Sequence, residues 1–233
     1  MILYLFDIDG TLLRAHRAGS RAFDAVFAEQ HGLEGACQGI RFGGKTDPAL
    51  IDEIFVARLG RRAATHEHAA FLDAYLQLLR ANLTSTGVEV LGGVPETLTW
   101  LGARPEVMLG IATGNVRAGA EAKLAAAGLD SYFSGGTIDA PGGYGCDSHI
   151  RAELVAAAIA RGRQRAEVDE VVVVGDTIHD ISAARACGAV VCAVATGSDP
   201  AEALAHADVV FTSLTELPAW HAARYCAAST ESP

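Results

Sequence analysis

Four consecutive valines, Val171–Val174, constrain the fold of this chain more than any other feature of its sequence. β-Branched residues favour extended backbone, and an apolar run without polar alternation is typical of a strand covered on both faces. Such strands belong to parallel sheets that lie between two layers of helices. Apolar runs of the same kind predict further strands at Ile2–Phe6, Val107–Ala112, Val190–Val194 and Val209–Phe211.

Alanine-rich helical patterns separate these strands, which is the order expected of a doubly wound α/β protein. Helices are predicted at Val116–Ala127, Ser148–Ala160 and Asp180–Cys187. Gly128 and Gly188 follow two of them at the place where glycine commonly ends a helix. The sequence therefore predicts an α/β fold with a doubly wound parallel sheet, a Rossmann-like core.

The segment 15–86 interrupts this alternation, because it contains helical patterns and no convincing strand. Pro48 stands at a first helical position behind the capping candidates Thr46 and Asp47. An all-helical insert after the first strand of an α/β sheet indicates a cap domain. We therefore expect a core domain of residues 1–14 and 87–233 and a helical cap domain of residues 15–86, with hinges near 13–19 and 85–92. The helices predicted in the insert are Ser20–Gln30, Pro48–Leu59 and Glu67–Asn82.

The composition and charge of the chain exclude several classes of protein. Half of its 233 residues are hydrophobic, which is enough for a sizeable core and rules out wholesale disorder. Its 18 basic and 28 acidic residues give a net charge of −10, which disfavours a nucleic-acid binder with a broad basic face. No apolar run is long enough to cross a bilayer.

The cysteine pattern and the amino-terminal residues indicate a cytoplasmic protein. The five cysteines are an odd number without a CxxC pair, so we expect reduced core residues rather than a disulfide framework or a metal finger. The apolar residues between Met1 and Asp7 lack a basic region before them and predict a buried strand, not a signal peptide. Ala227–Pro233 is expected to be a frayed tail.

Polar residues follow three of the predicted strands, at the edge where open α/β sheets bind their ligands. Because the carboxyl ends of parallel strands meet at one edge, four carboxylates and a hydroxyl are expected to converge there. Without a cation these carboxylates repel one another, and oxygen-only ligation favours Mg²⁺ over zinc or copper. The residues are Asp7, Asp9, Gly10 and Thr11 after the first strand, Thr113, Gly114 and Asn115 after the second, and Asp176 and Asp180 after the third.

The spacing of Asp7 and Asp9 suits a pair of carboxylates with separate tasks. Residues two apart on an extended strand point the same way, so one carboxylate is placed to act as nucleophile and the other as acid and base. A carboxylate that attacks phosphorus gives an aspartyl-phosphate. Each motif taken alone also fits an ordinary turn or helix cap. Their occurrence together, in this order and each at the end of a strand, is poorly explained by coincidence.

With these motifs in this order, from about Leu3 to Leu217, the chain resembles the haloacid dehalogenase superfamily, in its branch with a helical cap after the first motif. The pattern is most similar to enzymes described as phosphoglycolate-phosphatase-like. The resemblance implies a Mg²⁺-dependent phosphatase that hydrolyses a small phosphomonoester, such as phosphoglycolate, through an aspartyl-phosphate.

The resemblance also implies a role for each motif residue. Asp7 is then the nucleophile and Asp9 the general acid and base. Thr113, with the amides near Gly114 and Asn115, would hold the phosphoryl oxygens. Thr11, counted among the substrate-binding residues, would support the first loop by hydrogen bonding. Asp176 and Asp180 would complete the Mg²⁺ site with Asp7 and the backbone carbonyl of Asp9.

The third motif departs from the family pattern. Members of the family usually carry a lysine at the start of the helix before the fourth-motif strand, and the stretch 146–151 has none. Arg151 is the candidate cation there, since arginine supplies the same charge in a forked geometry. His149 is the alternative.

Asp9 favours a phosphate ester over other substrates, because an alkoxide leaving group benefits from a proton whereas a halide does not. Arg41 and Lys45 are the residues expected to bind the non-phosphate end of the substrate. Arg14 and Arg17 are weaker candidates, because arginines near a hinge are more often solvated. Lys45 also keeps a phosphonatase as an alternative, through a Schiff base. A sugar phosphomutase is less expected. Members of that branch usually carry a histidine early in the first cap helix, and the comparable place here is near Gly19, where His16 stands too early. The alternative that is not an enzyme is a non-catalytic module that binds a phosphorylated metabolite.

Overall fold

The core of the protein is a parallel sheet built from the predicted apolar runs. The computed structural model describes residues 1–133 and 140–226. Within them, six strands hydrogen-bond in the order β5-β4-β1-β6-β7-β8, and every neighbouring pair is parallel. All five predicted strands are confirmed. The strands are β1 (Ile2–Phe6), β4 (Val107–Ala112), β5 (Gly142–Gly143), β6 (Glu170–Gly175), β7 (Val190–Val194) and β8 (Val209–Phe211).

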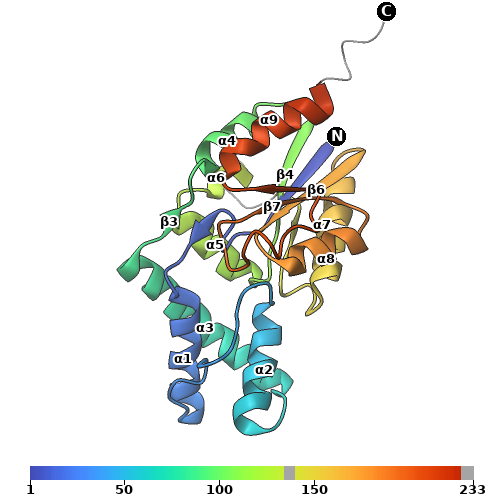
Figure 1. Cartoon of the computed structure of the whole chain (residues 1–233). Coiled ribbons are helices and arrows are strands. Elements are labelled where there is room, and N and C mark those ends of the chain that lie inside the picture. Colours follow the sequence, from blue (N-terminus) through green and yellow to red (C-terminus); the bar gives the residue numbers. More distant parts are fainter. Residues whose placement is uncertain (134–139, 227–233) are drawn as a thin grey trace, which may run out of the picture.

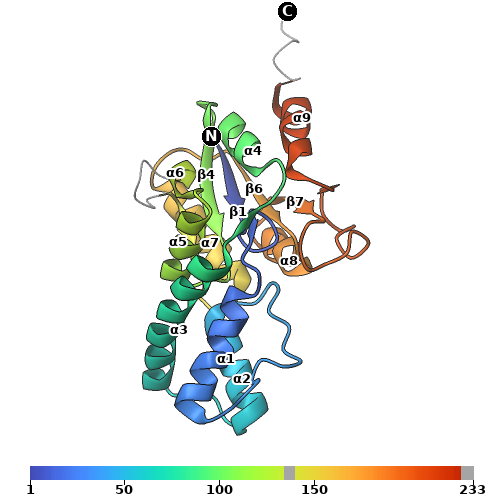
Figure 2. The same ribbon diagram turned by 90° about the vertical axis from the view of Figure 1, so that its left-hand side faces the viewer.

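Helices cover both faces of this sheet, as the fold prediction requires (Figures 1 and 2). Leu3 and Leu5 of β1 pack on one face with α7 (Arg151–Arg163) and α8 (Ile178–Ala186). Tyr4 and Phe6 pack on the other face. That face is covered by α4 (Val94–Gly102), α5 (Arg117–Ala126), α6 (Asp130–Phe133) and α9 (Leu217–His221). Two 3₁₀- or π-helical turns, η1 (Leu214–Glu216) and η2 (Ala222–Cys226), flank α9.

The predicted helix starts differ from the observed ones by one to three residues, and local hydrogen bonds explain two of these differences. The helix expected from Ser148 begins at Arg151, because the Ser148 hydroxyl accepts the N–H of Ile150 and forms a turn. The helix expected from Asp180 begins at Ile178. There Thr177 is the N-cap, its hydroxyl accepting the N–H of Asp180 while the Asp180 carboxylate accepts the N–H of Thr177.

Three helices and the segments around them form a helical lobe, which lies beyond the carboxyl edge of the sheet in Figures 1 and 2. All three were predicted, and Thr46 caps the second by accepting the N–H of Ala49. Buried aromatic side chains, Phe23, Phe27, Phe55, Phe71 and Tyr75, pack the helices together. The helices of this helical lobe are α1 (Ala18–His31), α2 (Asp47–Leu59) and α3 (Thr65–Thr86).

The two chain segments that join the helical lobe to the core lie side by side. They pair as a short antiparallel ribbon of β2 (Leu13–Arg14) and β3 (Glu89–Val90). His16 and Arg17, which follow β2, have left-handed backbone with φ of 43° and 64°. Such backbone is uncommon outside glycine and marks local strain at this junction.

Four cysteines, Cys37, Cys146, Cys187 and Cys192, are free thiols. Cys37 and Cys192 are buried and Cys187 is half-buried, as expected of core residues. Cys146 is exposed in the loop before α7, so the expectation of a core position is wrong for it. The predicted frayed tail, 227–233, lies outside the described residues. Across the described chain, none of the helices combines the length and the apolarity that a membrane span requires.

Candidate active site

Asp7 follows β1, the strand at which the order of the strands in the sheet reverses. β1 lies between β4 and β6, so the chain first crosses to one side of β1 and later to the other. Crevices at the carboxyl ends of the strands at such a switch point are where open α/β sheets bind ligands. Asp7 directly follows β1, and its N–H donates to the carbonyl of Val174 at 2.9 Å.

A tight loop after Asp7 brings Gly10 and Thr11 against Asp176. Gly10 has a φ of 85°, and a Cβ there would lie only 2.6 Å from Asp176 Oδ2, so the position requires glycine. Thr11 is fully buried, and its hydroxyl donates to Asp176 Oδ1 at 3.3 Å. Thr11 therefore stabilises the loop through this hydrogen bond. It is not among the residues that line the cavity described below.

Asp7, Asp176 and Asp180 form a buried acidic cluster. One oxygen from each lies within 4.8 Å of the others. Burial raises the pKa of Asp7 to about 6, Arg151 opposes the rise, and Asp180 and Asp9 add to it. Burial and the charges of Asp7 and Asp180 raise the pKa of Asp176 to about 8. These shifts mean that the cluster is short of positive charge, and an oxygen-only set of this kind fits a hard divalent cation.

Arg151, the first residue of α7, reaches into this cluster. Its Nη2 lies 3.1 Å from Asp7 Oδ1 and 2.6 Å from Asp180 Oδ1, and its Nε donates to Asp180 Oδ1 at 2.9 Å. Although burial opposes the charged form, the carboxylates of Asp180 and Asp7 raise the pKa of Arg151 above its ordinary value. His149, the alternative cation, is exposed and packs against His68 at a ring distance of 6.2 Å.

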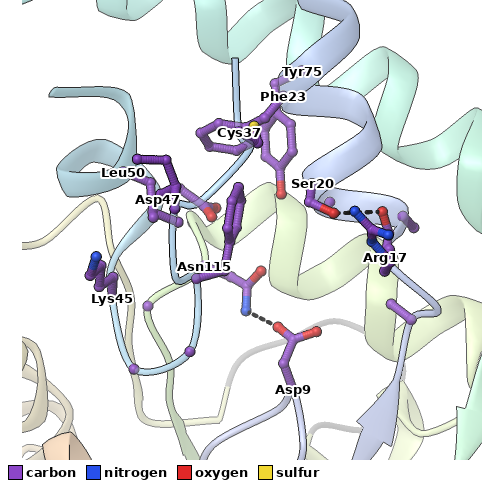
Figure 3. A pocket seen from close by; sticks show the side chains of 18 of the residues that line it. Asp9, Arg17, Ser20, Phe23, Cys37, Lys45, Asp47, Leu50, Tyr75 and Asn115 are labelled. Carbon is purple, nitrogen blue, oxygen red and sulfur yellow. Dashed lines mark hydrogen bonds between the residues drawn. The ribbon is translucent and has the colours of Figure 1, made fainter. Parts of the chain in front are cut away.

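Asp9 has different surroundings from Asp7. Its Oδ2 accepts hydrogen bonds from Asn115 Nδ2 at 2.8 Å and from Lys123 Nζ at 2.6 Å. Asn115 Nδ2 also donates to the hydroxyl of Thr113 at 2.8 Å. Figure 3 shows the Asn115 side chain directed at Asp9, whose carboxylate lies apart from the acidic cluster. The two motif aspartates thus have separate partners.

The helical lobe meets the core at the start of α2. A Cβ on Gly114 would collide with the backbone carbonyl of Lys45, so the contact requires glycine. The N–H of Asp47 donates to the carbonyl of Gly114 at 2.8 Å, and the Asp47 carboxylate accepts the N–H of Val116 at 2.8 Å. Burial raises the pKa of Asp47 to about 6, although Lys123 lowers it.

A cavity of about 710 Å³ lies between the helical lobe and the carboxyl edge of the sheet. Its core side includes Asp7, Asp9, Thr113, Gly114 and Asn115, together with Lys123 and Arg151. Its lobe side includes Arg17, Ser20, Phe23, Lys45 and Tyr75. Figure 3 shows the hydroxyl of Tyr75 pointing into this cavity, toward Asn115 and Asp9. Both motif aspartates therefore line the same cavity.

Comparison with known proteins agrees with this architecture. A family model described as haloacid dehalogenase-like hydrolase matches residues 3–188 of the 233. The chain belongs to the haloacid dehalogenase-like hydrolases. The predicted family and the prediction of a hydrolase are thereby confirmed. A search of the curated proteins found no match.

Solved structures share the fold of this hydrolase. CbbY from Rhodobacter sphaeroides, in complex with phosphate, is 19% identical with a TM-score of 0.70, over 92% of this chain and 95% of that one. A hydrolase from Pseudomonas syringae is 21% identical with a TM-score of 0.70, over 97% and 99%. A mutant CbbY in complex with xylulose-(1,5)-bisphosphate is 18% identical with a TM-score of 0.70, over 92% and 95%.

Lys45 and Arg41, which were predicted to bind the substrate of this hydrolase, both form ion pairs with carboxylates. Lys45 lines the cavity, but its ammonium group is 2.6 Å from Glu53 Oε2 and is turned away from Asp9 (Figure 3). Arg41 does not line the cavity. It forms an ion pair with Asp199, whose other oxygen accepts the N–H of Ile178 at 2.8 Å, so Arg41 joins the helical lobe to the core.

The structure adds three residues to the site that the sequence did not assign: Lys123, Tyr75 and Arg17. Lys123 had a signal, because it lies on the face of α5 that also carries the buried Ala120 and Leu124, where a lysine is out of place. Tyr75 had no such signal, because a tyrosine among apolar residues of a helix is ordinary core. Arg17 was a weak candidate from the sequence, because arginines near a hinge are ordinarily solvated.

Proposed function

We propose that this hydrolase is a Mg²⁺-dependent phosphomonoesterase that acts on a small phosphorylated metabolite through an aspartyl-phosphate at Asp7. The observation that carries the proposal is the separation of the two motif aspartates within one cavity. Asp7 lies in the acidic cluster against Arg151, whereas Asp9 is held by Asn115 and Lys123. Two carboxylates in different surroundings are suited to different tasks, one as nucleophile and one as acid and base.

In the first half of the reaction, a carboxylate oxygen of Asp7 attacks phosphorus and the bond from phosphorus to the ester oxygen breaks. Asp9 gives a proton to the departing alkoxide. In the second half, water attacks the phosphorus of the aspartyl-phosphate and gives a proton to Asp9. The bond between phosphorus and Asp7 breaks, which releases phosphate and restores both carboxyl groups to their starting states.

Fixed donors around Asp7 are suited to the charge on the transferring phosphoryl group. Thr113 and the backbone amides of Gly114 and Asn115 follow β4 at the same edge of the sheet, and we assign them to the phosphoryl oxygens. Arg151 adds a buried guanidinium beside the nucleophile. Its position against Asp7 supports its assignment as the cation of the third motif.

The acidic cluster supports the Mg²⁺ assignment. We assign Asp7, Asp176 and Asp180, with the backbone carbonyl of Asp9, as the groups that hold the ion. All are oxygen donors, and the raised pKa values of Asp7 and Asp176 are the expected result of carboxylates without a cation. When bound, the ion neutralises negative charge that would otherwise repel a phosphate ester.

The cavity supports a small phosphorylated acid, phosphoglycolate among the candidates, as the substrate. Its volume of about 710 Å³ is ordinary for a small-molecule site. Lys45, Lys123 and Arg151 each have a carboxylate partner, whereas no carboxylate pairs with Arg17 in the described part of the chain. Arg17 is therefore favoured over Arg41 and Lys45 as the cation for an acidic group on the substrate. In this account the helical lobe, residues 15–86, is the cap domain that excludes water.

The remaining assignments follow from the same features. The free thiols of the described cysteines support a cytoplasmic location. The net charge of −10 supports a metabolite rather than a nucleic acid as the partner. The ion pair of Lys45 with Glu53 counts against a Schiff base and hence against a phosphonatase, because a charged ammonium group is no nucleophile.

The test is phosphate release from a panel of small phosphomonoesters, phosphoglycolate included, in Mg²⁺ and then in EDTA. We expect turnover in Mg²⁺ that EDTA abolishes. The Asp7→Asn variant is expected to keep the fold and lose activity by a factor on the order of 10³ or more, because it removes the nucleophile. Full activity of Asp7→Asn would contradict the assignment. Saturable binding of a metabolite in Mg²⁺ without hydrolysis would favour the non-catalytic module instead.

A further inference from the structure

Lys123 is a buried lysine with a specific set of partners. The chain contains two lysines against sixteen arginines, and Lys123 is the one in the interior, with 5% of its surface exposed. Burying an ammonium group is unfavourable unless charges and acceptors of opposite sign surround it. Its Nζ lies 2.6 Å from Asp9 Oδ2 and 2.6 Å from Asn115 Oδ1. Its position is therefore tied to Asp9.

Lys123 determines which way the amide of Asn115 points. An ammonium group donates hydrogen bonds and accepts none, so the carbonyl oxygen of Asn115 must face it. The amide nitrogen then points the other way, where it donates to Asp9 Oδ2 and to the hydroxyl of Thr113, both at 2.8 Å. Lys123, Asn115 and Asp9 thus form a closed triangle of three hydrogen bonds.

Both donors reach the same oxygen of Asp9. Lys123 and Asn115 each contact Oδ2, and neither contact uses Oδ1. The Asp9 side chain lines the cavity and is 43% exposed, while that of Lys123 lies behind it at 6%. A carboxyl group held through one oxygen keeps a fixed orientation and leaves the other oxygen for proton exchange with a substrate.

We propose that Lys123 is a positioning residue: together with Asn115 it holds Asp9 Oδ2, so that Oδ1 faces the leaving-group oxygen of the substrate. The inference rests on the proposed function, in which Asp9 gives a proton to that oxygen. A compact ammonium group suits this role better than the broad guanidinium that the chain uses at nearly all of its other cationic positions.

The test is the dependence of the rate on the leaving group. The probes are p-nitrophenyl phosphate and phenyl phosphate, which have similar shapes but differ in how much the departing oxygen needs a proton. The variants are Lys123→Met, which removes the charge at nearly constant volume, Lys123→Arg, which keeps it, and Asp9→Asn. Lys45→Met, at the only other lysine, is the matched control.

In Lys123→Met we expect kcat/KM to fall on the order of 10²-fold with phenyl phosphate and less than about fivefold with p-nitrophenyl phosphate. The reason is that nitrophenolate departs without a proton, so a misplaced acid matters little for it. Asp9→Asn is expected to show the same selective loss, and Lys123→Met to add nothing in its background. Lys123→Arg should recover part of the loss, and Lys45→Met should change both esters alike.

Equal losses with both esters, or no loss with either, would overturn the positioning role. Should Lys123→Met not fold, as judged by circular dichroism, Lys123→Gln is measured in its place with the same expected selectivity. A wild-type enzyme that hydrolyses neither ester in Mg²⁺ contradicts the proposed function. A wild-type enzyme that hydrolyses both, with variants that lose both equally, contradicts this inference alone.

Discussion

At the scale of single residues, Arg151 supplies the charge that the acidic cluster otherwise lacks. Its guanidinium contacts both Asp7 and Asp180, and its side chain is buried. A buried charge and its partners depend on one another, because removing either leaves the other desolvated and unpaired. Arg151 therefore contributes to stability, and in the proposed function it also binds the phosphoryl group.

We expect Arg151→Met to lose stability by about 3–5 kcal/mol because it leaves buried carboxylates unpaired. It is also expected to lower kcat/KM with p-nitrophenyl phosphate on the order of 10²-fold or more, because a fixed cation beside the phosphoryl group is gone. Arg151→Lys, which restores the usual residue of the family, should stay within about tenfold of the wild type. Urea unfolding and steady-state rates measure both effects. A fully active Arg151→Met would contradict the role.

The sequence predicted most of the residues that the structure brings together, but not every contact between them. Asp7, Asp9 and Asp176 follow buried strands, and the topology of a parallel sheet alone places strand ends together. The place of Arg17 depends on how the helical lobe faces the cavity, which no local pattern encodes. A lysine on the buried face of α5 is a local signal, but the partners of Lys123 depend on how α5 packs against the core. Arg41 shows the converse, since its partner Asp199 lies far along the chain and its loop gave no sign of that ion pair.

At the scale of secondary-structure elements, the start of α2 joins the helical lobe to the core through Asp47. The Asp47 carboxylate accepts the N–H of Val116 just before α5, and its pKa is raised to about 6, chiefly by burial. Because the folded pKa lies above the ordinary value of 3.8 for an aspartate, the folded state binds more protons than the unfolded state between these values. The free energy of unfolding contributed by Asp47 therefore falls as the pH rises from 4 to 8.

We expect Asp47→Asn to raise the free energy of unfolding at pH 8 by up to about 3 kcal/mol, since the amide keeps an acceptor for Val116 without a buried charge. The gain should shrink as the pH falls to 4, where Asp47 itself is largely neutral. Urea unfolding across this range measures the effect. Asp73→Asn, at an exposed carboxylate of α3, is the control. A gain that does not depend on pH would contradict the account.

The sequence predicted which helices and strands form better than it predicted where each of them begins and ends. Long apolar runs and capped helices were predictable because their signal is local and repeated. β5 was not, because its pairing of Gly142 with Ile111 gives two glycines a strand conformation that their own preferences oppose. Thr177 sets the start of α8 through its reciprocal hydrogen bonds with Asp180. Aspartate is itself a common residue at helix starts, so the sequence placed the start at Asp180 instead.

At the scale of the whole molecule, the site lies where the sheet and the helical lobe meet. The sheet supplies the carboxylates and Arg151, while the helical lobe supplies the opposite wall of the cavity, including Arg17 and Tyr75. The β2–β3 ribbon carries both connections between the parts. In the proposed function, the cavity between them holds the substrate against Asp7 and limits its contact with water, which favours transfer to Asp7 over loss to water.

The central claim is that Asp7 becomes phosphorylated, and borohydride reduction during turnover tests it most directly. Borohydride reduces an acyl phosphate to an alcohol, which converts a phosphorylated aspartate to homoserine. The enzyme is treated while it hydrolyses p-nitrophenyl phosphate in Mg²⁺, and its peptides are analysed by mass spectrometry. We predict homoserine at position 7, dependent on both substrate and Mg²⁺, and at no other aspartate. Steady hydrolysis with unmodified Asp7, or homoserine at another position, would contradict the account.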